Sequence, residues 1–393
     1  MHVTEQHREV GPLLTSNPIV SADSRELIVK DSSTDAMEPG KHPCRVIAWP
    51  AYKNKAVNPY NWLLYSHIAK RGDTDIEEFH ARRLLAGRPD ILHVHWPEHL
   101  LSKPERFEAL TKIGLFATLV TAAKARGTRV VWTIHNLEPH ESHFPRVERW
   151  YRPWLERHLD GVIALTATGA ELAIDRFPAL RDTPMAIIPH GHYMDVYPRG
   201  MDRSAARREL GLSEDQAVVL FVGQIRPYKG VPTLIEQFRL LGRTDARLVI
   251  AGRPNTAETR REVELAAAGD ARIRLYLEHI ADDRLQVFFG AADLVVLPYQ
   301  EVLNSGTAIL ALSFLTPVLV PDRGAMAELQ QRFGDSVVLT YRGVLTAEVL
   351  GRALDEQMGK SLDRSSLERS VERQLGWSTI ADQTIAFFRE VAS

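Results

Sequence analysis

The chain has 393 residues, enough for two or three domains, and its 45% hydrophobic and 25% charged residues are typical of a soluble globular protein. Its 48 Lys and Arg against 50 Asp and Glu exclude the clear basic excess of a dedicated nucleic-acid-binding protein. A single cysteine, Cys44, excludes an intramolecular disulfide and a multi-cysteine metal site. Fourteen of the 15 histidines lie between His2 and His192, so the two halves of the chain differ in chemistry.

Residues 1–41 mix charged residues, Ser, Thr and Pro without the continuous apolar core of a signal peptide, which predicts a disordered leader. No stretch of about 18 uninterrupted apolar residues follows. The segment 302–321 comes nearest, but Asn304 and Pro317 interrupt it, and we expect a buried helix followed by a buried strand. The sequence therefore predicts a cytoplasmic protein, free or attached to the inner face of the plasma membrane without spanning it.

In the first half, short β-branched runs alternate with longer helical stretches. Such alternation is typical of βαβ units and parallel sheets. The predicted strands are Arg45–Trp49, Ile91–His95, Arg129–Ile134, Val162–Leu165 and Ala186–Pro189, and the predicted helices include Tyr60–Lys70, Arg106–Arg126 and Val147–His158.

The second half continues the alternation after a polar stretch, Tyr197–Ser204, which we interpret as a linker between two domains or as a surface loop. Near-continuous apolar runs such as Ala217–Val222 favour strands that are covered on both faces. The predicted strands are Val218–Val222, Arg247–Ala251, Arg272–Leu275, Leu294–Pro298 and Pro317–Val320, and the predicted helices are Val231–Leu241, Ala257–Ala268, Gly306–Phe314 and a final Ser378–Val391.

Histidines gather at the end of the strand Ile91–His95, in ILHVHWPEH. Strand alternation places His93 and His95 on one face. These two with Glu98 or His99 could form a metal site, but no further ligand cluster is implied and we predict none. The alternatives are hydrogen-bonded histidines at a strand end, or a strand end that lines a substrate cleft, which we favour over metal.

Three other segments of the first half carry candidate polar groups. The strand 129–134 ends before His135 and Asn136, and IIPHGHY places His190 after the strand near 187. His140 and Glu141 follow in the same loop as Asn136, with no resolved role. The helix after Phe144 interleaves arginines with aromatic residues, a pattern that suits either a membrane interface or a buried helix with one solvated face.

The segment VLFVGQIRPYKGVPTLIEQF places two cations directly after a strand. The strand ends at Gly223, and Arg226 and Lys229 follow in the loop before the next helix. Open parallel sheets bind ligands beyond the carboxyl ends of their strands, and two cations there neutralise a diphosphate. The alternative is an ordinary solvated loop.

The segment DLVVLPYQEVLNSGTAILALSFLTPVLVP predicts a strand, a polar loop with Glu301, and a helix opened by Asn304-Ser305-Gly306-Thr307. Free backbone N–H groups at a helix start attract anions. Asn304 or Ser305 could also simply cap the helix, and both roles are compatible.

Together these motifs, with HIADDRLQVFFGAADLVVLP between them, resemble the family-4-type glycosyltransferases of the GT-B fold. The resemblance is strong over residues 217–321 and weaker for the last helix. It implies an α/β fold with two Rossmann-like domains whose parallel sheets face a cleft. With the polar stretch at 197–204 as the boundary, we expect a leader at 1–41, an acceptor-side domain at 42–200 and a nucleotide-sugar-binding domain at 201–376, followed by a helix at 377–393 that, by the resemblance, crosses back to the first domain.

The resemblance also assigns roles to particular residues. It implies that Arg226 and Lys229 bind the donor diphosphate, that Glu301 serves the sugar, and that His135 approaches the transferred sugar; a hydrogen-bonded histidine at the edge of the core is the alternative for His135. The donor-binding candidates are Gly223, Arg226, Lys229, Asn304, Ser305, Gly306, Thr307, Arg253, His279 and Ile280, and the acceptor-side candidates are His95, Glu98, Asn136 and His190.

One departure concerns the two glutamates, separated by seven residues, that the family usually has in this region, the first of which falls at or beside Glu301. The second falls at Leu310, which puts the contact to the nucleotide ribose in doubt. The implied activity is transfer of a hexose from a nucleotide sugar to a saccharide or lipid-linked acceptor in bacterial polysaccharide or glycolipid synthesis, with retention, without a metal or cofactor. The alternatives are a nucleotide-sugar epimerase of the same fold and a non-catalytic sugar-nucleotide-binding protein.

Overall fold

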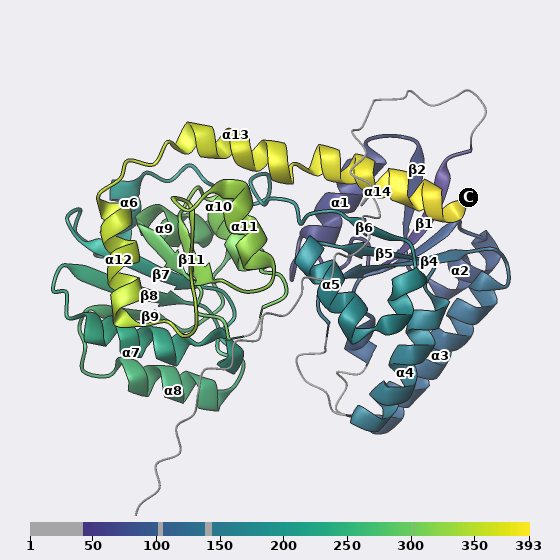
Figure 1. Ribbon diagram of the computed structural model, residues 1–393, viewed down its shortest axis with the longest axis horizontal. Helices are drawn as coiled ribbons and strands as arrows, with labels where there is room; N and C mark the ends of the chain where they lie inside the picture. The colour runs from purple at the N-terminus through teal and green to yellow at the C-terminus, as the bar shows by residue number, and fades with distance from the viewer. Residues whose placement is uncertain (1–41, 101–104, 138–143, 301) are drawn as a thin grey trace, which may run out of the picture. The chain divides into compact units, whose positions relative to one another are not determined.

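We describe a computed structural model of the chain, which covers residues 42–100, 105–137, 144–300 and 302–393 (Figure 1). The predicted leader, His140, Glu141 and Glu301 lie outside these residues. The structure contains two six-stranded parallel sheets with helices around them, which confirms the predicted α/β class.

The first sheet has the strand order β2-β1-β3-β4-β5-β6. Side chains alternate across it: Val131 and Thr133 of β4 face one side, whereas Trp132 and Ile134 pack in a second apolar cluster on the other. Its strands are β1 Cys44–Trp49, β2 Thr74–Glu78, β3 Ile91–Val94, β4 Arg129–Ile134, β5 Gly161–Ala164 and β6 Met185–Ile187, and its helices are α1 Tyr60–Ala69, α2 Ala81–Gly87, α3 Arg106–Lys124, α4 Pro145–His158 and α5 Ala167–Arg176.

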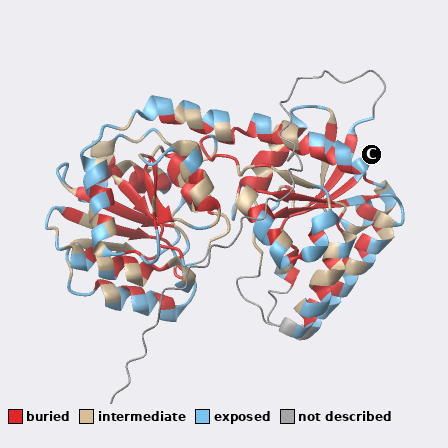
Figure 2. Ribbon diagram, viewed as in Figure 1, coloured by how far each residue is buried: buried red, intermediate tan, exposed pale blue. Residues whose placement is uncertain are grey.

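The second sheet has the order β12-β11-β10-β7-β8-β9. Its strands are β7 Ala217–Val222, β8 Ala246–Ala251, β9 Ile273–Tyr276, β10 Leu294–Val296, β11 Val318–Pro321 and β12 Val338–Tyr341, and its helices are α6 Arg203–Glu209, α7 Val231–Leu241, α8 Ala257–Ala267, α9 Leu285–Ala291, α10 Gly306–Ser313, α11 Ala325–Phe333 and α12 Ala347–Met358. Figure 2 shows the central strands buried and the outward faces of the helices exposed. All six residues of β7 are buried, as its continuous apolar sequence predicts.

The last two helices are α13 Arg364–Leu375 and α14 Trp377–Ala392. The Arg71 guanidinium, just beyond α1, donates to the Ser378 hydroxyl and to the Asp382 carboxylate, each at 2.7 Å. The buried Trp377 indole donates to the carbonyl of His192 at 2.6 Å. The final helix therefore packs against α1 and the strands of the first sheet, where the Phe388 ring lies 5.0 Å from the His93 ring.

The predicted strands and helices match the structure within two residues at most ends, but several elements were not predicted. β2 was missed because its sequence, TDIEE, is polar; it lies at the sheet edge, where alternation with an apolar face is weak. β12 was missed for a different reason: its sequence is apolar, but it is only four residues long. Among the described residues, no helix is both long and apolar enough to cross a membrane.

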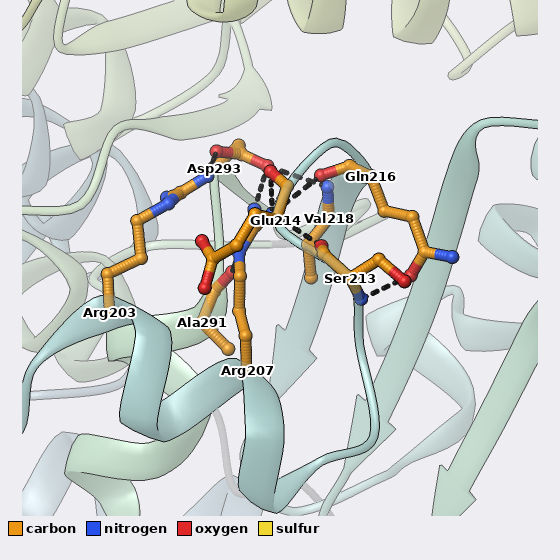
Figure 3. Close-up of polar contacts among 8 residues, drawn as sticks. All are labelled: Arg203, Arg207, Ser213, Glu214, Gln216, Val218, Ala291 and Asp293. Atoms are coloured by element: carbon orange, nitrogen blue, oxygen red, sulfur yellow. Dashed lines mark hydrogen bonds and ion pairs between the residues drawn. The ribbon is translucent and has the colours of Figure 1, made fainter.

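A buried arginine, Arg207, links several segments near the start of the second sheet by hydrogen bonds (Figure 3). The Arg207 side chain is 0% exposed and donates to the Asp293 carboxylate at 2.8 Å. It also donates to four carbonyl oxygens, those of Ser213, Glu214, Gln216 and Ala291. Asp293 in turn accepts from the backbone N–H of Val218 at 2.7 Å, so this pair fixes the loop before β7 against the start of β10.

We predict that Arg207→Ala lowers the free energy of unfolding by roughly 3–5 kcal/mol, because it leaves a buried carboxylate without its main partner. Arg203 is the matched control, since it pairs with the same carboxylate but its side chain is 37% exposed. Arg203→Ala should cost about 1 kcal/mol or less. Urea denaturation of both variants measures the difference, and equal losses would contradict the assigned role of burial.

Candidate functional site

The carboxyl ends of β7 and β10 form the switch point of the second sheet. β7 pairs with β8 on one side and with β10 on the other, so the connections after β7 and β10 leave in opposite directions, as they do where open parallel sheets bind ligands. The loop after β7 carries Arg226 and Lys229, and the loop after β10 leads to Ser305. The backbone N–H of Gln300 donates to the carbonyl of Tyr228 at 2.9 Å, which joins the two loops.

Two glycines let these loops approach. Gly230 has φ 66°, and a Cβ there would lie 2.4 Å from the carbonyl oxygen of Pro298, closer than any side chain permits. Gly223 has φ 117°, and its Cβ position lies 3.4 Å from Oγ1 of Thr307 and 3.7 Å from Nζ of Lys229. The structure therefore brings Gly223, Lys229 and Thr307 together, as the donor-site hypothesis requires.

The helix α10 begins at this same point. The Ser305 hydroxyl accepts a hydrogen bond from the backbone N–H of Ala308 at 3.1 Å, so Ser305 is the N-cap. Among the described residues, no hydrogen bond engages the N–H of Gly306 or Thr307. Capping and an anion-attracting helix start thus coexist beside Lys229, whose ammonium lies 5.4 Å from the Tyr299 ring centre.

The remaining donor-side candidates lie along the same edge of the sheet. Arg226 donates through Nε to the Gln224 side chain at 3.1 Å. Arg253 is exposed after β8, and its carbonyl accepts from the N–H of Ile225 at 3.0 Å. His279 and Ile280 follow β9, the edge strand.

The end of the first sheet holds a chain of hydrogen bonds among the candidate histidines. The Tyr65 hydroxyl, from α1, lies 2.8 Å from Nδ1 of His93 and 2.6 Å from Nε2 of His95. Nδ1 of His95 lies 3.0 Å from Nε2 of His135, and Nε2 of His93 lies 2.8 Å from the Thr133 hydroxyl. Sequence reasoning did not single out Tyr65 or Thr133, although Thr133 lies two residues before His135 on one strand.

Glu98 and Asn136 form a second polar pair at these strand ends. The Asn136 amide donates to Glu98 at 3.3 Å. Burial raises the pKa of Glu98 to about 7, with partial compensation from its hydrogen bonds and from Arg152. The pair lines a small pocket together with Pro97, Trp132, Leu137, Tyr151, Arg152, Leu155, Glu156 and Phe177. Aromatic walls with a carboxyl and an amide suit a sugar ring.

His190, the last acceptor-side candidate, lies between the two sheets. Its Nδ1 contacts the carbonyl of Gly191 at 2.7 Å, and its Nε2 contacts the Tyr193 hydroxyl at 3.2 Å. Tyr193 is in turn 3.2 Å from the position of a Cβ on Gly306. A small pocket here is lined by His190, Asn304, Ser305 and ten other residues, but neither Arg226 nor Lys229 contributes to it.

Comparison with known proteins now decides the family. Residues 202–361 match the model of "Glycosyl transferases group 1". The chain is also 36% identical over 303 residues to a GDP-mannose:glycolipid 4-beta-D-mannosyltransferase of Xanthomonas campestris, covering 77% of this chain and 81% of that protein. The chain belongs to the group 1 glycosyltransferases.

Solved structures agree with this assignment at the level of the fold. A glycosyltransferase from Rickettsia africae aligns with a TM-score of 0.64 at 13% identity, over 89% of this chain and 98% of that one. Anabaena HepE, crystallised with UDP-glucose, aligns with a TM-score of 0.63 at 15% identity, over 88% of this chain and 99% of that one. These glycosyltransferases share the GT-B fold that the sequence motifs implied, and the resemblance is confirmed.

The raised pKa of Glu98 predicts how stability varies with pH. Between the ordinary glutamate range and pH 7 the folded protein holds a proton that the unfolded chain has lost, so Glu98 makes folding less favourable as pH rises. Glu98→Gln removes this titration. We expect the variant to gain stability relative to the parent by up to about 3 kcal/mol between pH 5 and pH 8.

Thermal unfolding of both proteins at the two pH values provides the measurement. Glu105→Gln, at the exposed start of α3, is the control and should show no such trend. A difference between parent and Glu98→Gln that does not change with pH would refute the assigned pKa.

Proposed function

We propose that this enzyme transfers a hexosyl group, mannosyl in the first instance, from a nucleotide-diphosphate sugar to a saccharide or lipid-linked saccharide. The gathering of Gly223, Lys229 and the start of α10 at the switch point carries the proposal. Mannose and GDP are suggested by the name of the Xanthomonas relative. Bacterial exopolysaccharide or glycolipid synthesis is the setting that such an acceptor implies.

In this mechanism the donor diphosphate lies against the β7 loop and the α10 start. Negative charge grows on the diphosphate as the glycosidic bond breaks, and fixed positive groups stabilise that charge without reorganisation. Arg226 offers a planar fork to phosphate oxygens, Lys229 a point charge, and the N–H groups of Gly306 and Thr307 two further donors. Because these groups supply the charge, we propose that neither a metal nor a cofactor is needed.

The anomeric outcome is a separate question. Retention stays a prediction of the family resemblance. The name of the Xanthomonas relative favours the opposite result, because GDP-mannose carries its sugar in the α configuration and a 4-beta product then requires inversion. Leu310, at the position of the family's second glutamate, marks another departure from the usual pattern.

The acceptor side is proposed at the ends of β3 and β4, where Glu98 and Asn136 line their cavity. Contact with a membrane surface is proposed for α4, on which Trp150 is 56% exposed and Arg149 is exposed beside it.

If α4 contacts the membrane, sugar transfer to a glycolipid in anionic vesicles should exceed transfer to the same saccharide in solution. Trp150→Ser should abolish this preference for the vesicle-bound acceptor.

Incubating the enzyme with a panel of nucleotide sugars, with and without acceptor, tests the function. We expect nucleotide diphosphate release that depends on acceptor, is greatest with GDP-mannose, and persists with EDTA. A changed sugar nucleotide without acceptor would indicate an epimerase, and saturable binding without turnover a non-catalytic protein. Proton NMR of the glycoside formed gives its configuration.

We further predict that Arg226→Ala and Lys229→Ala each lower kcat by about 100-fold or more, the loss typical of a group that stabilises developing charge. The matched control is Arg352→Ala, on helix α12, where the side chain is 73% exposed. It should transfer sugar as the parent does. Steady-state kinetics with saturating donor gives the comparison, and transfer by Arg226→Ala at the parental rate would disprove its role at the diphosphate.

A further inference from the structure

The hydrogen bonds that link His135 to four buried side chains all donate in one direction along the chain. Its members occur in the order Thr133, His93, Tyr65, His95, His135, and each contacts the next at 2.6–3.0 Å. The first four are fully buried, with 0% exposure. A neutral histidine donates from one ring nitrogen and accepts at the other, and a tyrosine hydroxyl has a single proton, so fixing one bond fixes all the others.

The Thr133 hydroxyl fixes that first bond. Among the described residues its only hydrogen-bond partner is Nε2 of His93. If His93 donated to it, the threonine proton would be buried without an acceptor, which is costlier than a spare lone pair. Thr133 therefore donates to Nε2 of His93, and His93 carries its proton on Nδ1.

The remaining bonds follow in turn. Nδ1–H of His93 donates to the Tyr65 oxygen, so the Tyr65 hydroxyl donates to Nε2 of His95. His95 then carries its proton on Nδ1 and donates it to Nε2 of His135. With Nε2 accepting, neutral His135 has its own proton on Nδ1.

Burial keeps every histidine in this chain uncharged. It lowers the pKa of His93 to about 3 and those of His95 and His135 well below the ordinary histidine range, helped for the latter two by neighbouring histidines. An imidazolium at His95 would also carry two N–H groups facing Tyr65 and His135. The ordered chain and the low pKa values thus agree on neutral rings.

The surroundings of His135 hold its ring in place. The ring stacks on Trp96 at 4.4 Å between centres and meets the edge of Tyr60 at 4.9 Å, which restricts a flip. Among the described residues no hydrogen bond engages Nδ1. The His135 carbonyl accepts from the Asn304 amide at 3.2 Å, so the residue lies next to the start of α10.

We propose that Tyr65, His93, His95 and Thr133 are positioning residues that hold His135 in the Nδ1–H tautomer, so that this histidine, which the family resemblance places near the transferred sugar, meets a sugar hydroxyl as a neutral hydrogen-bond donor. This role rests on the proposed glycosyltransferase function. It differs from that of a general base, because the ring nitrogen that faces the substrate already holds a proton. The acceptor hydroxyl must then lose its proton to another group.

Three substitutions of His135 distinguish a hydrogen-bond donor from a general base at this position. The amide nitrogen of Asn lies as many bonds from Cα as Nδ1 of histidine, whereas that of Gln corresponds to Nε2. We expect His135→Asn to keep kcat/KM within about 10-fold of the parent, and His135→Gln and His135→Ala to fall about 10-fold further, the worth of one lost hydrogen bond. Equal losses in all three, or a Gln variant better than Asn, would overturn the proposal.

Nitrogen-15 NMR of labelled histidines in the substrate-free enzyme tests the tautomer independently of activity. The His135 resonances, assigned by their loss in His135→Asn, should report Nδ1–H and no protonation between pH 6 and pH 9. Tyr65→Phe should mix the tautomers, whereas Tyr52→Phe, whose ring meets Tyr65 at 6.2 Å but lies outside the chain, should not.

The activity measurement and the NMR measurement test the proposed function and the tautomer separately. A parent enzyme that transfers no sugar would remove the proposed function and leave the tautomer standing on the NMR result. An Nε2–H tautomer in an active parent, or a Tyr65→Phe spectrum unchanged from the parent, would overturn the inference alone.

Discussion

Parallel strands cannot be joined by tight hairpins, so each connection crosses a face of the sheet and every carboxyl end emerges along one edge. Both sheets of this enzyme obey that constraint, and all the described site candidates lie just beyond those carboxyl ends or on the helices that start there. The order β10-β7-β8 then adds the switch point at which two loops diverge. Topology, more than any one side chain, brings Lys229 and Thr307 together from segments far apart in sequence.

This dependence explains which features could be predicted. The RPYKG loop and the NSGT helix start each carry local signals, a strand end with cations and an N-cap, so their position on one sheet edge followed from the fold class alone. Their contact required two glycines: Gly230 to pass the carbonyl of Pro298, and Gly223 to face Thr307. The sequence shows these glycines, but the backbone angles that require them belong to the folded chain.

The histidine chain illustrates what could not be predicted. Alternation correctly put His93 and His95 on one face of β3, yet Tyr65 comes from a different element, and its hydroxyl reaches both rings only because α1 packs on that face. Propensity and periodicity say which face a residue occupies. They carry no information on the partner opposite, which depends on helix packing over a distance of 28 residues in sequence.

The uneven distribution of histidines acquires a physical meaning from burial. A chain of imidazoles is tolerable in a protein core only when its members are neutral and each N–H has an acceptor, because an unpaired buried donor costs about 1–3 kcal/mol. The first sheet meets that condition at His93 and His95, and it presents the Nδ1–H of His135 as an uncharged, oriented donor suited to sugar hydroxyls. A diphosphate makes the opposite demand, for positive charge that does not vary with pH, and the second sheet offers arginine, lysine and backbone N–H groups instead. The histidines and the cations could not exchange places. Neutral imidazoles would leave the negative charge of the phosphates without a counter-charge, and buried cations next to the sugar would need counter-charges that a sugar does not provide.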